Sequence, residues 1–218
     1  MFNAARVRSL RDRGKSRPVS GGYYDYTPTV TLARAVVFAG HPGSTGREIV
    51  YDLASLTGLP LHDLDRLIEH EAGQSLWSLV RERGAAALRV VEEELLSRAL
   101  ESQPSGLIVV GESALMQSDL RAQIQQRAGL VFFRLPAAAC YWSLCRQTEE
   151  RDGILGHPLL PDRLTDVADL RPLMAGLQPA VIAADRVVDL EHRGVHETVL
   201  DLHKALPQLG TIDEAEGR

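Results

Sequence analysis

A glycine-rich turn is the first feature of this sequence whose residue types and spacing could do chemistry. Its sequence is GHPGSTGRE (40–48), and it lies between the apolar run AVVFAG (35–40) and a helix-prone segment. At such a turn, backbone N–H groups and the N-terminus of a helix can hold a phosphate group. The working motif is G-x-x-x-x-G-K-[ST], whose lysine contacts the β- and γ-phosphates and whose hydroxyl holds magnesium. The turn therefore has the setting of a phosphate-binding loop.

The residues of this turn match the motif only in part. Counted from Gly40, the second glycine of the motif is Thr45, the lysine is Gly46 and the hydroxyl residue is Arg47. A one-residue insertion would instead make Gly46 and Arg47 the glycine–lysine pair, followed by Glu48. If no anion binds, the glycines only shape a strand-to-helix turn. The candidate residues of this degenerate nucleotide loop are Gly40, Gly43, Ser44, Thr45, Gly46 and Arg47.

Apolar runs and helix-prone stretches alternate along the chain and must position these residues. Strands are expected at 35–40, 59–65, 107–111, 130–135 and 186–190. Helices are expected at 46–57, 66–101 with breaks near Gly73 and Gly84, 116–127, 137–149, 163–177 and 194–206. This alternation predicts an α/β fold, with a parallel sheet covered by helices on both faces. Ligands bind where the carboxyl ends of such strands meet, so functional residues are expected at 40–47, 63–65 and 111–113.

Composition limits the class of protein. The chain has 218 residues, of which 44% are hydrophobic and 24% charged, so we expect one folded domain and exclude intrinsic disorder and collagen-like repeats. No apolar run approaches the roughly 18–20 residues that span a bilayer, which excludes a transmembrane protein. Cys140 and Cys145 match neither a zinc spacing nor a CxxC redox pair. A reducing, cytoplasmic location is the simplest interpretation.

Charge is distributed unevenly along the chain. Residues 1–18 carry five arginines and one lysine against one aspartate, although the net charge of the whole chain is −5. We expect residues 1–33 to form a basic, disordered arm, 34–206 the folded domain, and 207–218 a flexible acidic tail. The arm could also be read as a targeting peptide. Because the body is acidic, the sequence argues against nucleic-acid binding.

Longer stretches of the sequence resemble one enzyme family. The segment EIVYDLASLTGLPLHDLD (48–65) is similar, without a gap, to the helix and D-x-D strand that follow the phosphate loop in shikimate kinases. RLIEHEAGQSLWSLVRERG (66–84) and ALRVVEEELL (87–96) resemble later motifs of the same family. The resemblance covers about 35–205. Its gap-free register favours the alignment in which the loop has lost its lysine and its hydroxyl.

The resemblance implies a three-layer phosphate-loop kinase fold with five parallel strands, helices on both faces, a small helical substrate-covering subdomain and a lid. It also implies MgATP-dependent phosphorylation of the shikimate 3-hydroxyl, in aromatic amino-acid biosynthesis. Asp63 stands at the family's acid near magnesium, and Arg47 is the candidate to replace the lysine. Asp65 matches the residue that binds substrate hydroxyls, and Arg89 the arginine that pairs with the substrate carboxylate.

Other positions depart from the family pattern. Gly111, Glu112 and Ser113 lie where the family has three glycines. Gly111 and Glu112 are thus candidate substrate-binding positions, although Glu112 should repel phosphate or carboxylate groups. In the lid, His157 replaces an arginine, which Arg146 or Arg151 could compensate for. At the position of the family's second substrate-binding arginine, this chain has Leu177. Since phosphoryl transfer depends on such cations, we expect weak or absent kinase activity, with Mg and ATP used only if activity survives.

Two interpretations stay open. The chain is either a divergent active shikimate kinase that uses Arg47, or a non-catalytic protein that binds a small carboxylate or aromatic ligand. The second interpretation draws on a further resemblance: EAGQSLWSLV (71–80), LRVVEEELL (88–96) and DLRPLMAGL (169–177) are similar to segments of the shikimate-kinase-like domain of benzoyl-CoA-responsive regulators. That resemblance implies a sensor of a small aromatic or CoA ligand. The helix-turn-helix domain of those regulators would not fit in the roughly 34 residues before this domain. We expect a monomer or weak dimer, with a protein partner possible.

Simpler interpretations apply to several residues. Asp63 and Asp65 could cap the following helix, and Arg89 could form a surface ion pair. His192 and His196 have helical metal-ligand spacing but no third ligand near them in the sequence. The remaining expectations are that Trp77 packs against the helical subdomain, that Trp142 is in the core and that Glu92–Glu94 form a solvated face.

Overall fold

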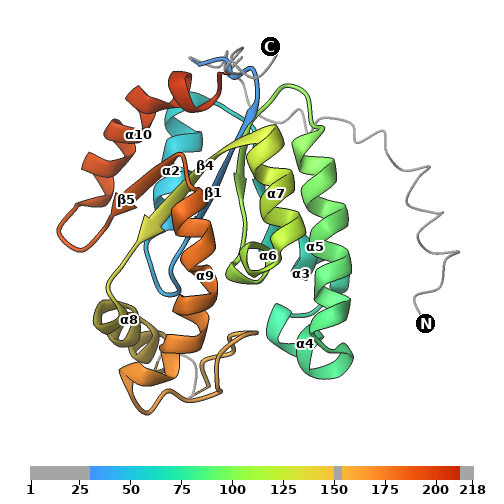
Figure 1. Ribbon diagram of the computed structural model, residues 1–218, viewed down its shortest axis with the longest axis vertical. Helices are drawn as coiled ribbons and strands as arrows, with labels where there is room; N and C mark the ends of the chain where they lie inside the picture. The colour runs from blue at the N-terminus through green and yellow to red at the C-terminus, as the bar shows by residue number, and fades with distance from the viewer. Residues whose placement is uncertain (1–29, 150–153, 212–218) are drawn as a thin grey trace, which may run out of the picture.

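Five apolar runs form one parallel sheet in the computed structural model, which describes residues 30–149 and 154–211. The strands are β1 (Ala35–Gly40), β2 (Leu61–Asp63), β3 (Leu107–Val109), β4 (Ala128–Arg134) and β5 (Arg186–Asp189). Their order across the sheet is β2-β3-β1-β4-β5, and every neighbouring pair is parallel. The predicted fold class is therefore confirmed (Figure 1).

Helices connect the strands in the order that the sequence predicts. They are α2 (Gly46–Thr57), α3 (Leu64–Ala72), α4 (Leu76–Arg83), α5 (Ala85–Leu100), α6 (Glu112–Met116), α7 (Ser118–Arg127), α8 (Ala137–Glu149), α9 (Arg171–Ala183) and α10 (Val195–Leu209). The expected breaks near Gly73 and Gly84 divide the long stretch into α3, α4 and α5. Gly73 adopts the left-handed conformation that ends a helix, with φ of 67°. Before α9, a short 3-10 helix covers Val167–Leu170.

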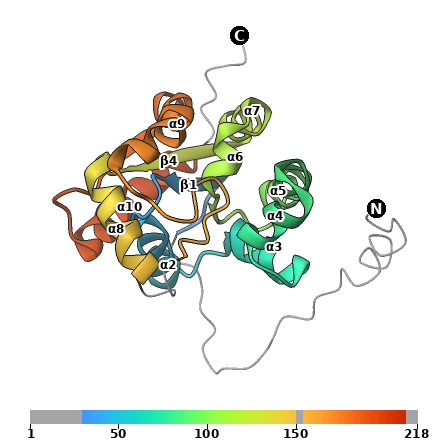
Figure 2. The same cartoon turned by 90° about the horizontal axis from the view of Figure 1, so that it is seen from below.

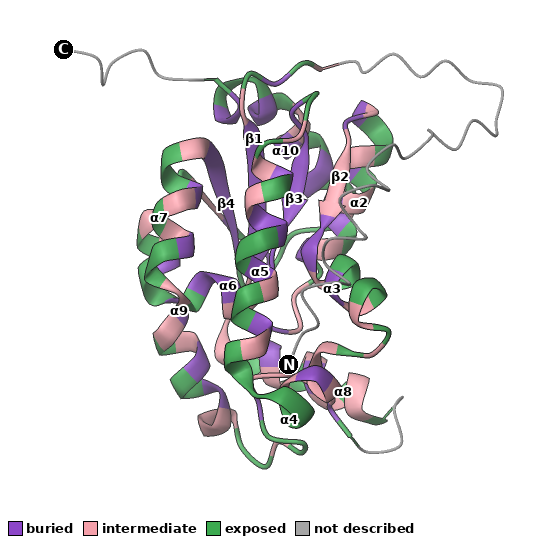
Figure 3. Cartoon of the chain, turned by 90° about the vertical axis from the view of Figure 1, so that its right-hand side faces the viewer, coloured by how far each residue is buried: buried purple, intermediate pink, exposed green. Residues whose placement is uncertain are grey.

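The alternation of side chains along each strand separates two cores. Val36 and Phe38 of β1 pack in a cluster with residues of α2 and α10, on one face of the sheet. Val37 and Ala39 point to the opposite face, where the cluster includes residues of α3, α5, α7 and α9. Strands β1, β3 and β4 are buried between these two helical layers (Figure 3). This three-layer arrangement fixes the carboxyl ends of the strands at one edge.

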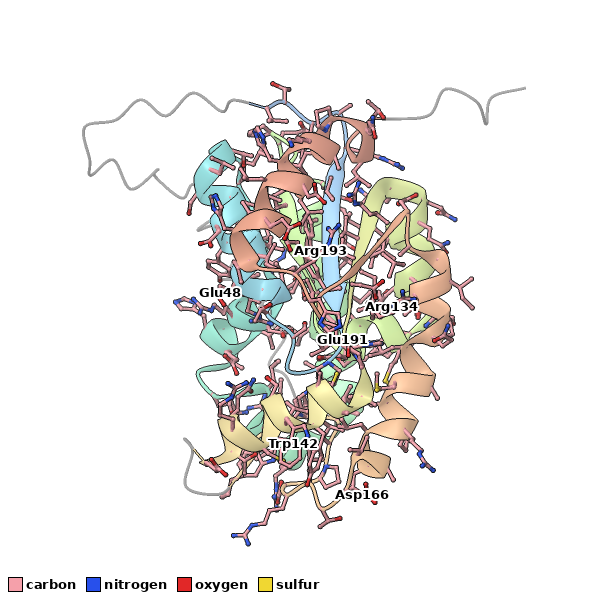
Figure 4. The ribbon with its side chains drawn as sticks, turned by 90° about the vertical axis from the view of Figure 1, so that its left-hand side faces the viewer. Glu48, Arg134, Trp142, Asp166, Glu191 and Arg193 are labelled. Carbon is pink, nitrogen blue, oxygen red and sulfur yellow. The ribbon has the colours of Figure 1, made fainter. Side chains whose placement is uncertain are left out.

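Two expectations about buried and exposed residues are wrong. Trp142 was expected in the core, but it is 69% exposed and lies on the outer side of α8 (Figure 4). Leu144 and Cys140 occupy the buried positions of that helix instead. Glu92 was expected in a solvated face, but it is only 3% exposed because its position on α5 faces inward, whereas Glu94 is exposed.

Residues 1–29 and 212–218 lie outside the described residues. The predictions of a disordered arm and a flexible acidic tail are therefore untested there. The described part of the predicted arm includes Leu32, which is buried and would contact a Cβ at Gly210. Helix α10 continues to Leu209, three residues beyond its predicted end. In the described ranges, no helix has the length and apolarity to cross a membrane, and no cluster of side chains has the arrangement of a metal site.

Candidate functional site

A cavity of about 510 Å³ opens at the carboxyl edge of the sheet. Seen from below, α2, α3, α6 and α8 surround this edge, and the described segment 154–166 passes across it (Figure 2). The cavity is lined by residues from the glycine-rich loop, the start of α3, the end of β3 and the segment after α8. Most of the predicted site residues meet here: Gly40, Gly43, Ser44, Gly46, Arg47, Asp65, Gly111, Glu112 and His157.

Arg47 joins the two aspartates that follow β2. Its guanidinium group donates hydrogen bonds to both carboxylate oxygens of Asp63 at 3.0 Å and to Asp65 at 2.5 Å. Tyr51, one turn further along α2, donates its hydroxyl to Asp63 at 3.0 Å. Asp63 also caps α3, by accepting a hydrogen bond from the backbone N–H of Arg66. Asp63 is thus both a helix cap and a site residue, and Arg47 is the counter-ion of both carboxylates.

Burial sets the electrostatics of this group. Only 5% of the Asp63 side chain and 16% of the Asp65 side chain are exposed. Burial raises the pKa of Asp65 to about 6, although the charge of Arg47 opposes this rise. Burial by itself lowers the pKa of Arg47, but Asp65 and Asp63 outweigh it and raise that pKa above its ordinary value. The guanidinium charge is therefore fixed in place by the aspartates.

The glycine-rich loop lacks room for the lysine that its motif requires. Gly46 is buried, and a Cβ atom at this position would overlap the aromatic ring of Phe133. Phe133 lies in β4, directly beside Gly40 in the sheet register. Gly43 has φ of 73°, and its carbonyl accepts a hydrogen bond from Ser143 at 2.7 Å. The loop is therefore packed against β4 and α8 in a form that excludes a side chain at position 46.

The described residues do not fit MgATP. Position 46 carries no lysine, and the ring of Phe133 occupies the space where one would begin. Arg47 stands at the hydroxyl position of the motif, and its guanidinium group is bonded to Asp63, the predicted magnesium-binding acid. Thr45, the last loop residue before α2, is exposed and caps that helix without a side-chain hydrogen bond. The site therefore has a fixed guanidinium where the motif needs a metal and a phosphate.

The opposite wall of the cavity is formed by Gly111, Glu112 and His157. A Cβ atom at Gly111 would lie 2.6 Å from Asp65, so only glycine lets β3 approach α3 this closely. Glu112 and His157 lie 3.6 Å apart, with 19% and 15% of their side chains exposed. Burial acts to raise the pKa of Glu112, but the contact with His157 outweighs it and holds that pKa below its ordinary value. His157 thus contacts the residue that replaces a glycine of the family pattern.

Arg89 lies apart from the other predicted substrate-binding residues. Its side chain is 54% exposed and donates a hydrogen bond to Asp119 at 2.5 Å. It does not line the cavity, so the structure does not bring it together with Asp65. This geometry matches the alternative of a surface ion pair. Arg146 is exposed and does not line the cavity either, and Arg151 lies outside the described residues.

A buried carboxylate that the sequence assigned to the surface lies behind this wall. Glu92 of α5 accepts hydrogen bonds from Ser113 and from Gln117, the latter at 2.7 Å. Burial, together with the charges of Asp65 and Glu112, raises the pKa of Glu92 to about 7, although the hydrogen bonds from Ser113 and Gln117 oppose this rise. Asp65, Glu92 and Glu112 therefore influence one another electrostatically.

Replacing Glu92 with glutamine is expected to stabilise the protein at pH 8. The raised pKa of about 7 means that the protonated Glu92 stabilises the fold at low pH, and that this stability is lost as the pH rises through 7. The variant buries no charge but loses part of the hydrogen bonding, so we expect a net gain of about 1–2 kcal/mol. This corresponds to roughly 2–8 °C in Tm at pH 8, measured by thermal unfolding from pH 4.5 to 8.5.

Glu94→Gln, on the exposed side of the same helix, is the matched control and should leave the pH dependence unchanged. A Glu92→Gln variant that is less stable than the wild type at every pH would contradict the assignment.

Two residues of the site, Tyr51 and Phe133, were not predicted from the sequence. Tyr51 had a signal, because it follows Arg47 by four residues and so lies on the same face of the helix. Phe133 had none, because its contact with Gly46 depends on the order and register of β1 and β4.

The comparisons with known proteins agree with this architecture. The shikimate kinase family model matches residues 44–201. A shikimate kinase from Caulobacter vibrioides is 28% identical over 159 residues, which cover 70% of this chain and 76% of that protein. One from Rhodococcus jostii is 32% identical over 90 residues, covering 41% of this chain and about half, 53%, of that protein.

Solved structures show the same fold. The shikimate kinase from Acinetobacter baumannii in complex with shikimate matches with a TM-score of 0.65 and 19% identity, over 78% of this chain and 90% of that chain. The shikimate kinase from Aquifex aeolicus matches with a TM-score of 0.64 and 19% identity, over 79% of this chain and 95% of that chain. Since the family model spans well over half of the chain, this protein belongs to the shikimate kinase family.

Proposed function

We propose that this chain is a non-catalytic member of its family, which binds a small hydroxylated ligand without transferring a phosphoryl group. One observation carries the proposal: the guanidinium group of Arg47 is bonded to Asp63 and Asp65 together. A residue held in this way neutralises the acids that a kinase would use for a metal and a substrate hydroxyl. The alternative, in which Arg47 replaces the missing lysine, would require both ion pairs to break.

The loss of cationic groups supports the same conclusion. Phosphoryl transfer is accelerated almost entirely by positioning and by cations, and one arginine finger alone is worth about 10³–10⁵ in rate. Among the described residues, the lysine position is Gly46, the lid position is His157, and Arg89 faces Asp119. With three such groups lost or displaced, we expect turnover at least about 10³-fold below the 1–100 per second that is typical of kinases.

Ligand binding remains compatible with the site. A volume of about 510 Å³ lies within the usual range of small-molecule pockets, about 300–1,000 Å³. Asp65 and Glu112 reach this cavity from the first turns of α3 and α6, and their oxygens can accept hydrogen bonds from ligand hydroxyls. The cavity therefore keeps the means to hold a polar ring-sized molecule.

A coupled ADP-release assay with MgATP and shikimate tests the proposal. We expect no shikimate-dependent signal above that of the Arg47→Ala and Asp65→Asn variants, which exposes any contaminating kinase. Binding of ATP, measured by isothermal titration calorimetry, should be undetectable with and without Mg²⁺. Shikimate-dependent turnover near 1–100 per second that disappears in Arg47→Ala would overturn the proposal and establish an active divergent kinase.

A further inference from the structure

Residues 154–166, which we call the strap, form part of the cavity wall. His157 and Pro158 of the strap line the cavity, and the Nε2 atom of His157 lies 3.6 Å from the carboxylate of Glu112 at the start of α6. Figure 2 shows the strap crossing the carboxyl edge of the sheet. How far this edge is open to solvent therefore depends on the position of the strap.

The cavity-lining part of the strap is a closed loop. The backbone N–H of Leu155 donates a hydrogen bond to the backbone carbonyl of Asp162 at 2.9 Å. Leu155 and Leu160 are 3% and 8% exposed and belong to the core cluster that includes residues of α3 and α5. Gly156 turns the chain after Leu155, with φ of 62° and no atom within 4 Å of a Cβ at that position. The residues that line the cavity thus lie on a short loop that closes at Asp162.

Asp162 also ties this loop to α4. The indole Nε1 of Trp77 donates a hydrogen bond to Asp162 Oδ1 at 2.9 Å, and the guanidinium group of Arg81 donates one to Asp162 Oδ2 at 2.8 Å. Trp77 and Arg81 lie about one turn apart on the same face of α4, with the guanidinium carbon 4.8 Å from the centre of the Trp77 ring. A single carboxylate thus uses both of its oxygens to bind one short helix, 81 and 85 residues away in the sequence.

This contact lies at the surface, which makes it reversible. The side chains of Arg81 and Asp162 are 58% and 49% exposed, and exposed ion pairs contribute little to stability. Helix α4 is also lightly anchored, because Leu79 is its one buried residue and the glycines at its two ends, Gly73 and Gly84, have positive φ. The contact can therefore break and form again while the core stays folded.

We propose that Asp162, Trp77 and Arg81 form a latch that controls entry to the cavity. With the latch formed, the strap is held across the carboxyl edge of the sheet. When the latch breaks, the loop that includes His157 can move away from α6, and the cavity opens. This inference does not depend on the proposed function, because such a latch would control the exchange of any small ligand of this cavity.

Hydrogen–deuterium exchange of the full-length protein, followed by mass spectrometry, tests the latch. Asp162→Ala removes both side-chain hydrogen bonds but keeps the backbone carbonyl that accepts from Leu155. We expect exchange in the peptide that contains Leu155 to be about three- to tenfold faster than in the wild type, since modest hydrogen bonds are lost. Trp77→Phe keeps an aromatic ring but loses the N–H donor, so a smaller increase is expected.

Glu71→Gln is the matched control for these variants. It removes the charge of an exposed acid of α3 that pairs with Arg98 of α5, and the two side chains are 41% and 54% exposed, close to the values for the latch. Exchange in the strap should not change in this variant. Circular dichroism and Tm verify that each variant is folded. If Asp162→Ala does not fold, Trp77→Phe and Arg81→Gln provide the test.

A thiol in the cavity lining tests the control of entry. Ser44→Cys places this thiol in the lining, in a Cys145→Ser background in which Cys140 is fully buried. The probe is methyl methanethiosulfonate, a small neutral thiol reagent. We expect Asp162→Ala to increase the rate at which this thiol is modified by about three- to tenfold, in step with the exchange of the strap.

Two results would overturn the inference. Strap exchange that is unchanged in the latch variants, or that rises equally in Glu71→Gln, would show that Asp162 does not hold the strap. Faster exchange without faster modification of the thiol at position 44 would show that the strap does not control entry. Neither readout depends on phosphoryl transfer, so the proposed function stands or falls separately, by the ADP-release assay.

Discussion

An Arg47→Ala variant is expected to be less stable than the wild type by about 2–4 kcal/mol. Removing one partner of a buried ion pair usually costs about 3–5 kcal/mol, because the other charge stays buried and unpaired. Here two carboxylates, of Asp63 and Asp65, would lose the same partner. Because 38% of the Arg47 side chain is exposed, solvent screens part of the effect, and the expected loss is smaller than for a fully buried pair. The Tm should fall by roughly 5–15 °C.

The effect should depend on pH with a definite sign. The pKa of Asp65, already raised to about 6, should rise further without the guanidinium group. The folded variant then holds a proton that it loses as the pH rises, so its deficit relative to the wild type should be larger at pH 8 than at pH 5. Thermal and urea unfolding at both pH values measure this difference.

Arg89→Ala is the matched control for this variant. It removes an ion pair with Asp119 in which both side chains are about half exposed, so solvent screens the pair and little or no change in stability is expected. Equal losses of stability in the two variants, or a deficit of Arg47→Ala that is larger at pH 5, would show that Arg47 is not the counter-ion of the buried aspartates.

A lysine at position 46, where the phosphate-loop motif has one, is expected to destabilise the fold rather than to create ATP binding. A Cβ atom at Gly46 would overlap the ring of Phe133, which is 1% exposed, so the ring or the loop would have to shift. Overpacking of a core costs about 1–3 kcal/mol and sometimes more, and a lysine here also adds a buried charge. For Gly46→Lys we expect a loss of about 3 kcal/mol or more, with no ATP binding by calorimetry.

A double-mutant cycle isolates the contact between these two residues. Gly46→Ala should cost about 1–3 kcal/mol in the wild type and close to nothing when Phe133 is replaced by alanine, since the overlapping ring is then absent. Phe133→Ala by itself should cost about 3–5 kcal/mol as a large-to-small core change, so the cycle is best measured by urea unfolding at low temperature.

Gly194→Ala serves as the control for glycine replacement, because a Cβ atom there has no neighbour within 4 Å, and a change below about 1 kcal/mol is expected. Equal costs of Gly46→Ala with and without the Phe133 ring would remove the steric explanation for the missing lysine.

Local sequence patterns predict much of the architecture. The run 35–40 forms β1 with the predicted bounds, and 46–57 forms α2 with the predicted bounds, because unbroken apolar strands and amphipathic helices depend on short-range periodicity. Element ends that depend on packing were less accurate. Helix α9 runs to Ala183 rather than 177, since Leu177 and Ala180 continue its buried face.

The sequence also indicated where the site lies, because parallel strands bring their carboxyl ends to one edge whatever their order. Gly46, Arg47, Asp65, Gly111 and Glu112 line one cavity at that edge. The sequence could not assign the partners of these residues.

By itself, the sequence determined the family, the three-layer α/β fold and the edge at which a ligand would bind, since motifs and periodicities are local. Only the tertiary structure decided what each charged or aromatic side chain contacts. Strand register places the Phe133 ring against Gly46, and helix packing turns Glu92 inward and Arg89 toward Asp119. The position of α2 beside the end of β2 brings Arg47 to two aspartates. These contacts join residues distant in sequence, so their geometry is fixed only when the layers have packed together.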